Sequence, residues 1–430
     1  MRATVTAMVG ALCVAGDASA HAQSLVGTWQ AKAGNNKGVV QVTRLKDGRL
    51  HAEVYYLGQE FSGNTRNGNP VSTIAVQGRY VHFDLDESPG TFDGELSADG
   101  DTIQGTWASP QGLLPLKFDR ATKTTAWAID PSPHKVRFVT VEPGVQLEVL
   151  DWGGEGPPLT FLAGHGCTAH EFDGFAPKFT GKHHVYGITR RGWGMSSKPE
   201  PNDYNYDSDR LGDDVLAVMD ALKLDRPVIA GHSLAGQELS SIGARHPERV
   251  AGLVYLDASY AYAFYSPTRT DERIGPDSSI LRRDLRRLYG PNTPSQTRAL
   301  IQEMQETLPR LREDLQTVSG IMEGQSDPLR QPHETLRDRI DEYLDSSGRK
   351  YTDIKAQVLA IVATPKPCGN QCDAPQVKAS AASQAAQADA FQAGVPSAHV
   401  VRIANAQHFV FLSNEADVVR EMNAFMDGLR

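Results

Sequence analysis

A serine stands where an apolar run gives way to small residues. Residues 228–236 read Val-Ile-Ala-Gly-His-Ser-Leu-Ala-Gly. At a sharp strand-to-helix turn the serine Oγ projects from the sheet, and only small neighbours let such a turn close. Glycine usually stands two residues after the serine, but here Ala235 takes that place and Gly236 follows. The pattern predicts Ser233 as a nucleophile for acyl transfer, and the alternative is a turn with no catalytic meaning.

A base must stand within reach of such a serine. The hydroxyl attacks a carbonyl only when a neighbouring group accepts its proton, and neutral imidazole suits that task near pH 7. Among 13 histidines, His408 follows the last apolar run, residues 399–403, and precedes a further apolar stretch. We therefore predict His408 as the general base.

The carboxylate that would orient this imidazole has two candidates. Asp257 ends the apolar run 252–256, whereas Asp373 lies some way beyond the run 358–363, which has no carboxylate at a short distance. An aspartate at a strand end also commonly caps the following loop. We favour Asp257 over Asp373, and either would orient the imidazole and stabilise its cation.

A second loop could stabilise the negative charge that forms during attack. Residues 161–167 read Phe-Leu-Ala-Gly-His-Gly-Cys, an apolar run that ends in a His-Gly pair. A tetrahedral oxyanion needs hydrogen-bond donors that are fixed in advance. We predict that the backbone amides of Cys167 and Leu234 form this oxyanion hole. The thiol of Cys167 is not expected to act as a nucleophile.

The elements that must position these residues alternate along the second part of the chain. Short apolar runs are separated by helix-length segments, which favours a mostly parallel sheet with helices on both faces. From about residue 260 to 350 the runs stop, and a charged, helix-favouring segment indicates a lid. Four aromatic residues near its start line the pocket or belong to the core: Tyr260, Tyr262, Phe264 and Tyr265. The Ala/Gln-rich stretch at residues 379–393 indicates a surface helix before the last strand.

With Ser233, Gly166 and His408 in place, residues 135–430 resemble the α/β-hydrolase superfamily. Residues 188–196 are similar to its Arg-Gly-x-Gly-x-Ser loop and residues 245–250 to its His-Pro-x-x-Val step. The resemblance implies an α/β-hydrolase fold with a helical lid insertion, and a carboxylesterase-like serine hydrolase with no metal or organic cofactor. It does not name a substrate, because the superfamily contains esterases, lipases, peptidases, C–C hydrolases and peroxidases. Haloalkane dehalogenases of similar fold carry a carboxylate at the nucleophile position.

The first part of the chain has a different pattern. From Leu25 to about Ala121, apolar and polar residues alternate in short runs between turn signals, which is typical of a small antiparallel β-domain or up-and-down barrel. Gly27-Thr28-Trp29, repeated at residues 105–107, resembles the opening Gly-x-Trp of lipocalin-like domains. We expect this β-domain at residues 23–122, a linker at 123–134 and the hydrolase domain at 135–430.

The first residues are typical of a secretory signal peptide. Arg2 precedes a short apolar run, residues 5–15, and Ala20-His21-Ala22 has small residues at the positions a signal peptidase requires. We expect cleavage after Ala22 and an exported protein, periplasmic or extracellular. A membrane anchor is the alternative, but this run is shorter than the roughly 20 residues of a spanning helix. In an oxidising compartment Cys368 and Cys372 could form a disulfide or remain two thiols.

Charge and composition restrict the partners. The chain has 430 residues and a formal net charge of −9, with no basic cluster long enough to follow a phosphate backbone. We expect no nucleic-acid partner and no membrane span, and a small neutral or cationic substrate is easier to accommodate. An ester is the simplest substrate. The alternatives are an amide or C–C bond hydrolase with the same triad, and a non-catalytic ligand-binding protein with a degenerate hydrolase domain.

Overall fold

The computed structural model describes residues 25–429 except 34–35, 46–47, 58–68, 86–89, 110–111, 128–133, 267–273, 323–335 and 347. The predicted signal peptide lies outside the described residues. The chain divides into two compact units, which meet in the sequence at residues 131 and 132. Within the described part, none of the helices combines the length and the apolar character that a membrane crossing requires.

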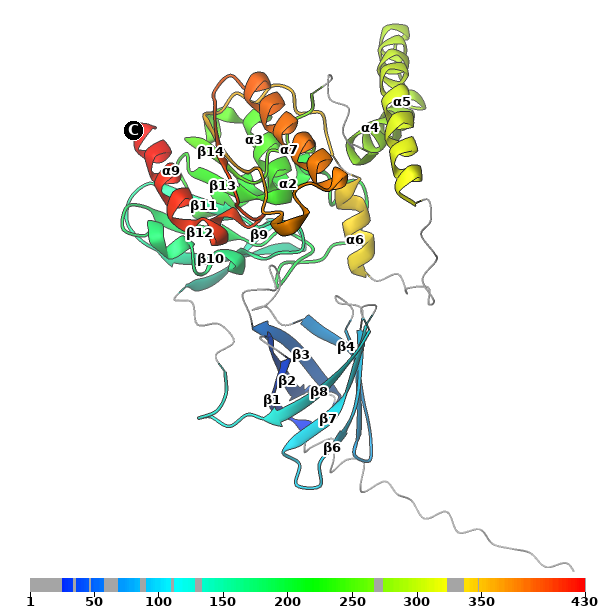
Figure 1. Cartoon of the computed structure of the whole chain (residues 1–430), viewed down its shortest axis with the longest axis vertical. Coiled ribbons are helices and arrows are strands. Elements are labelled where there is room, and N and C mark those ends of the chain that lie inside the picture. Colours follow the sequence, from blue (N-terminus) through cyan, green and yellow to red (C-terminus); the bar gives the residue numbers. More distant parts are fainter. Residues whose placement is uncertain are drawn as a thin grey trace, which may run out of the picture. The chain divides into compact units, whose positions relative to one another are not determined.

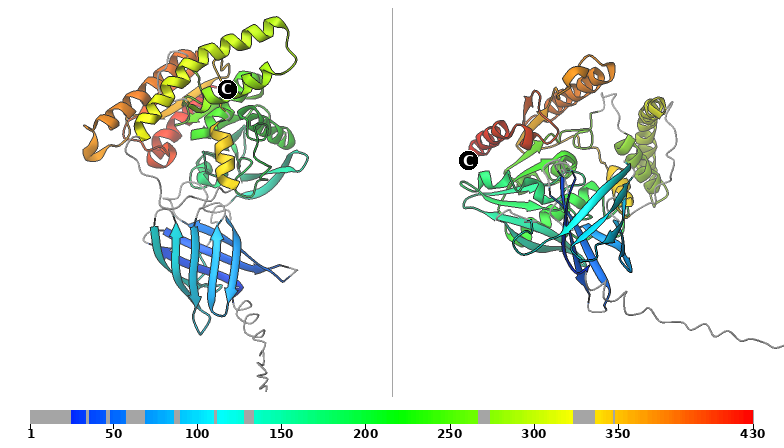
Figure 2. Two further views of the ribbon diagram at one scale, coloured as in Figure 1. Left: turned by 90° about the vertical axis from the view of Figure 1, so that its right-hand side faces the viewer. Right: turned by 60° about the horizontal axis from the view of Figure 1, so that its bottom comes forward.

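The first unit is a closed barrel of eight antiparallel strands (Figure 2). Each strand pairs with the next in the sequence, and β1 closes the barrel by pairing with β8. Its buried side chains include Trp29, Phe83, Phe92 and Phe118, as expected for eight strands, whose interior is just wide enough for side chains to fill. This confirms the predicted antiparallel β-domain. The strands are β1 (Gly27–Ala33), β2 (Asn36–Arg44), β3 (Leu50–Leu57), β4 (Asn69–Gln77), β5 (Tyr80–Leu85), β6 (Gly90–Leu96), β7 (Thr102–Ser109) and β8 (Gly112–Arg120).

The second unit is built on an eight-stranded mixed sheet in the order β16-β15-β14-β13-β11-β12-β10-β9. From β12 to β16 neighbouring strands are parallel, while β9 and β10 form an antiparallel edge. The strand order reverses at β11, and in open sheets of this kind ligands bind at such a point, beyond the carboxyl ends of the strands. The strands are β9 (Lys135–Glu142), β10 (Val145–Gly153), β11 (Pro158–Leu162), β12 (His184–Ile188), β13 (Val228–His232), β14 (Gly252–Leu256), β15 (Val358–Ala363) and β16 (Ala398–Ile403).

Two apolar cores cover the two faces of this sheet. Along β15, Val358 and Ala360 enter one core, whereas Leu359 and Ile361 enter the other, as the pleat of a strand requires. The first core includes side chains from α2 (Ser208–Leu222), α3 (Gly236–Arg245) and α7 (Pro375–Gly394). The second includes η1 (Ala169–Phe172), η2 (Ala176–Phe179), α8 (Val410–Ser413) and α9 (Glu415–Gly428).

In the described part of the segment between β14 and β15 there are three helices. They are α4 (Ile274–Leu288), α5 (Pro294–Met322) and α6 (Leu336–Asp345), and Figure 1 shows them in yellow-green to yellow. This arrangement confirms the predicted α/β-hydrolase fold with a helical insertion after a separate β-domain. After β15, Cys368 and Cys372 are joined by a disulfide.

Candidate active site

Ser233 lies at a tight turn between β13 and α3. It is the first residue of η3 (Ser233–Ala235), and its φ of 51° is in the left-handed region, which few residues other than glycine adopt. The small residues around it are required by close packing. A Cβ atom on Gly236 would lie 2.0 Å from the carbonyl oxygen of Ala258, and one on Gly231 would lie 2.9 Å from the Cβ of Ala235. The turn therefore holds the hydroxyl of Ser233 at the carboxyl edge of the sheet.

The structure brings Ser233, His408 and Asp257 together. His408 Nε2 lies 2.8 Å from Ser233 Oγ, and His408 Nδ1 lies 2.7 Å from Asp257 Oδ2. The three residues follow β13, β16 and β14, whose parallel carboxyl ends share one edge of the sheet. Asp373, the other candidate acid, is fully exposed and pairs with Lys378. The geometry therefore selects Asp257 as the carboxylate that contacts the imidazole.

Asp257 is a buried, multiply hydrogen-bonded carboxylate. Its Oδ1 accepts a 3.0 Å hydrogen bond from the amide of Ala363, and its Oδ2 accepts a 2.8 Å bond from the hydroxyl of Tyr260. Lys366 Nζ lies 3.4 Å from Oδ2. Burial alone would raise the pKa of Asp257, but the hydrogen bond to His408 and the charge of Lys366 outweigh it and lower the pKa below its usual value. The carboxylate is thus ionised at neutral pH and can stabilise an imidazolium.

Two tyrosines contact this triad. Burial, together with the nearby charge of Asp257, raises the pKa of Tyr260 far above its ordinary value. Burial also raises the pKa of Tyr262, although a hydrogen bond with Ser233 opposes that rise. Both hydroxyls are therefore neutral, one at the acid and one at the nucleophile. Two other aromatic residues from the same stretch, Phe264 and Tyr265, are buried, and Phe264 packs against Phe391 in the core.

The loop after β11 is held against Ser233 from several sides. A Cβ atom on Gly164 would lie 3.3 Å from the Cβ of Ser233. The amide of Gly164 donates a 3.0 Å hydrogen bond to Glu171, and Arg190 donates to the carbonyl oxygens of Ala163 and Gly164 at 2.9 and 3.2 Å. These contacts fix the loop backbone before any substrate is bound, which an oxyanion hole requires.

The two predicted oxyanion donors stand at the ends of neighbouring strands. Leu234 follows Ser233 directly after β13, and Cys167 lies in the loop after β11, the strand that pairs with β13. The Cys167 amide makes a long, 3.3 Å hydrogen bond to Gly164 O. Burial, and then the nearby carboxylate of Glu171, raises the pKa of the Cys167 thiol well above its ordinary value. The thiol is therefore protonated at neutral pH, which is the wrong state for a nucleophile.

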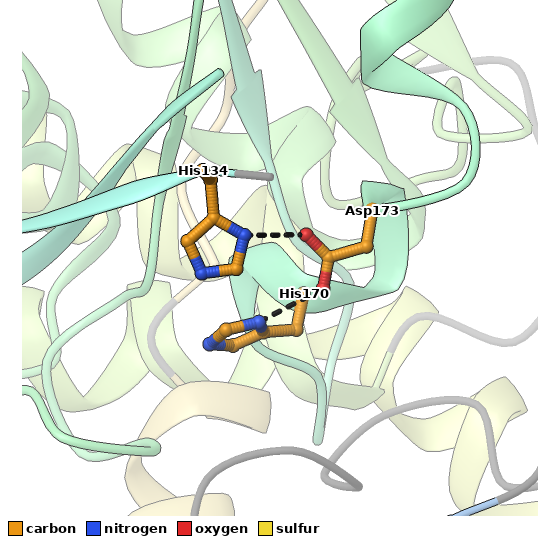
Figure 3. A group of neighbouring side chains, drawn as sticks. All are labelled: His134, His170 and Asp173. Carbon is orange, nitrogen blue, oxygen red and sulfur yellow. Dashed lines mark hydrogen bonds and ion pairs between the residues drawn. The ribbon is translucent and has the colours of Figure 1, made fainter. Parts of the chain in front are cut away.

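A buried polar cluster lies next to this loop. Figure 3 shows His134 and His170 facing the carboxylate of Asp173, with Nδ1–O distances of 3.0 and 2.9 Å. The Trp152 indole donates to the same carboxylate at 3.1 Å. Burial alone would lower the pKa of His170, but hydrogen bonds to Asp173 and Glu148 raise it.

Of the described residues, His134, His170 and Asp173 form the group whose spacing could hold a metal ion, with ligand atoms within 4.8 Å of one another. All three side chains are nearly fully buried. The hydrogen bonds account for the contacts within the cluster, because the raised pKa of His170 favours a charged imidazole beside the buried carboxylates. The cluster therefore ties η1 to the first described residue of the second unit.

Sequence reasoning missed the residues that support the site. Lys366, Glu171 and Arg190 come from three separate segments and share no spacing that could identify them before folding. The aromatic residues at the start of the lid were the only such signal. It identified Tyr260 and Tyr262 as candidates for the pocket lining, but it did not indicate that their hydroxyls contact the triad.

Comparison with known proteins identifies the class of protein. Residues 161–421 match the Alpha/beta hydrolase family, and the chain belongs to that family. Its relatives include a fluoroacetate dehalogenase from Burkholderia sp (30% identical over 115 residues, 26% of this chain and 38% of the relative) and a non-heme chloroperoxidase from Streptomyces lividans (33% over 136 residues, 31% and 48%). A bifunctional esterase/perhydrolase from Acinetobacter calcoaceticus is 32% identical over 125 residues, 28% of this chain and 44% of the relative.

These matches are partial, and the chain spans less than half the length of each of these curated relatives. Among solved structures, the chain is similar to an E-2-(acetamidomethylene)succinate hydrolase, with 18% identity, 68% of this chain and 99% of that chain covered, and a TM-score of 0.43. The comparisons therefore establish the family and leave the substrate open.

Proposed function

We propose that the protein is a serine hydrolase that cleaves a small carboxylic ester through an acyl-enzyme on Ser233. One observation carries the proposal. Ser233, His408 and Asp257 form a continuous hydrogen-bonded chain, with distances of 2.8 and 2.7 Å. Acyl transfer needs this arrangement, in which the nucleophile is hydrogen-bonded to the base and the base to an orienting carboxylate.

In the proposed reaction, His408 Nε2 accepts the proton of Ser233 as Oγ attacks the ester carbonyl. Asp257 holds Nδ1–H of the imidazole and stabilises the cation that forms. The amides of Cys167 and Leu234 would donate to the oxyanion of the tetrahedral intermediate. His408 then protonates the leaving alcohol, and a water molecule activated by the same imidazole releases the acid.

The names of the relatives span several reactions. They include an esterase/perhydrolase, a chloroperoxidase and a fluoroacetate dehalogenase. A serine at the nucleophile position favours acyl chemistry for this chain. Amide or C–C bond hydrolysis with the same triad is the second candidate, because the triad is not specific for the bond it cleaves.

The proposal is tested with a fluorophosphonate probe and 4-nitrophenyl esters of graded chain length. We expect the purified wild type to be labelled, and labelling and ester hydrolysis to disappear in Ser233→Ala. Well-folded wild type that reacts with neither would contradict the proposal and favour the binding-protein alternative. Labelling without ester hydrolysis would favour the amide or C–C bond alternative.

We also propose that the protein is exported, on the basis of the signal-like residues 1–22. Expression in a bacterial host should yield a mature protein in the periplasm or medium that begins at Gln23. Mass spectrometry of the intact chain measures this directly. A cell-associated product that retains residue 1 would contradict export.

A further inference from the structure

Arg337 extends from the lid helix α6 onto the oxyanion loop. A Cβ atom on Gly166 would lie 3.1 Å from Nη2 of Arg337. Gly166 belongs to the same short loop as Gly164, which packs against Ser233. The guanidinium is therefore in contact with the loop that also contacts the nucleophile.

The guanidinium is anchored in an unusual way. Its Nε atom donates to both carboxylate oxygens of Asp341, at 3.0 and 2.9 Å, and Asp341 also accepts a 2.7 Å hydrogen bond from His165. The Arg337 side chain is only 15% exposed, and its guanidinium lies over the ring of Trp193 at 4.6 Å from the centroid. Among the described residues, neither Nη1 nor Nη2 has a hydrogen-bond acceptor.

A second unpaired donor lies in the same place. Trp193 is fully buried, and its indole Nε1–H has no acceptor in the described part of the chain. Buried donors without partners are rare, because each loses its hydrogen bonds to water without a replacement. The two Nη groups of Arg337, which lie over the ring of Trp193, thus leave donors at the active-site loop that an anionic ligand could satisfy.

Apolar side chains lie between the guanidinium of Arg337 and the nucleophile. Leu234 and Tyr262 lie beside Ser233. Both pack in one cluster with Trp193 and with Ile340 of α6. An aliphatic spacer, rather than a polar one, matches these apolar neighbours if the scissile carbonyl lies at Ser233 and a charge lies at the far end.

We propose that Arg337 binds a carboxylate on the acyl part of the substrate, so that the preferred substrates are half-esters of short dicarboxylic acids. This inference rests on the proposed function, because it names the substrate class of the same site. A guanidinium whose Nε is held by Asp341 presents its two Nη groups as a pair, which matches the two oxygens of a carboxylate. Local charge at the site, rather than the net charge of −9, then decides which substrate binds.

The test compares two 4-nitrophenyl esters of equal length, the half-ester of glutaric acid and the ester of valeric acid. We expect the wild type to prefer the half-ester in kcat/KM. In Arg337→Met, the ratio of the two kcat/KM values should fall by about 10- to 100-fold, the range expected for a charge-assisted hydrogen bond. Arg339→Met is the matched control, because Arg339 lies on the same helix, carries the same charge and pairs with the exposed Glu200.

Three outcomes would overturn the inference. They are a wild type without preference for the half-ester, an Arg337→Met variant whose ratio is unchanged, and an equal fall of the ratio in Arg339→Met. Fluorophosphonate labelling in parallel separates these results from a failure of the proposed function. If the wild type is not labelled, calorimetry with glutarate itself still decides, because binding should be measurable in the wild type and lost in Arg337→Met.

Discussion

At the scale of single residues, two backbone conformations mark the site. Ser233 and Asp257 have φ angles of 51° and 44°, and both directly follow buried parallel strands. Positive φ in residues other than glycine is costly and persists where the surrounding structure enforces it. At both positions the conformation turns the chain sharply at the strand end, so that the side chains of two neighbouring strands meet one imidazole.

The choice between the two candidate acids leads to a direct prediction. Asp257→Asn should lower kcat by on the order of 10³- to 10⁴-fold, because the amide cannot stabilise the imidazolium and favours the wrong tautomer. Asp373→Asn should leave kcat within about twofold, since Asp373 is fully exposed and contacts Lys378. Steady-state ester hydrolysis measures both. A large loss in Asp373→Asn with an active Asp257→Asn would reverse the assignment.

Cys167 should be inert as a thiol. Burial raises its pKa well above the ordinary value of 9.0, so that the thiolate is absent throughout the neutral range and reactivity should not appear as the pH rises to 8. In the native protein we expect Ellman's reagent to leave Cys167 unmodified until the chain is unfolded. Cys167→Ala should retain ester hydrolysis, because the proposed role belongs to the backbone amide. Rapid modification that abolishes activity would contradict this role for Cys167.

At the scale of elements, the sequence predicted what depends on local pattern. The buried strands β13, β14 and β15 are near-continuous apolar runs, and their end residues could be placed at one sheet edge because parallel strands share it. Helix α7 agrees with the predicted helix at residues 379–393.

Contacts between distant elements could not be predicted in this way. The short helix η1 carries Glu171 to the amide of Gly164, and α6 carries Arg337 to Gly166. In each case the partner is fixed only when the whole second unit has folded. Similarly, His134 ended the predicted linker, yet its side chain is buried against Asp173. No spacing in the sequence indicates that contact.

The nucleophile turn should be intolerant of added volume at Gly236. In Gly236→Ala the new Cβ would lie 2.0 Å from the backbone oxygen of Ala258, so that the turn or the following loop must move. We expect unfolding free energy to fall by about 1–3 kcal/mol, and fluorophosphonate labelling to slow. Gly181→Ala is the control, because nothing lies within 4 Å of its added Cβ. Equal behaviour of the two variants in urea unfolding would contradict this account of the turn.

At the scale of the whole molecule, each unit has its own apolar core. The barrel core contains Phe92, which is fully buried, stacks on Phe83 at 4.8 Å and meets Phe118 edge-on at 5.2 Å. Among the residues that the structure describes, the cores of the second unit contain no barrel residue. Units with separate cores unfold as separate cooperative transitions unless a large interface couples them.

We therefore expect two transitions in calorimetry, and Phe92→Ala to lower only one of them. Loss of a buried phenylalanine costs about 3–5 kcal/mol, and that cost should fall on the barrel alone. Ser233 should keep its wild-type rate of fluorophosphonate labelling in this variant, because the triad belongs entirely to the second unit. A single transition that Phe92→Ala lowers as a whole, together with slower labelling, would mean that the barrel stabilises the catalytic unit. The β-domain would then be a structural requirement for catalysis.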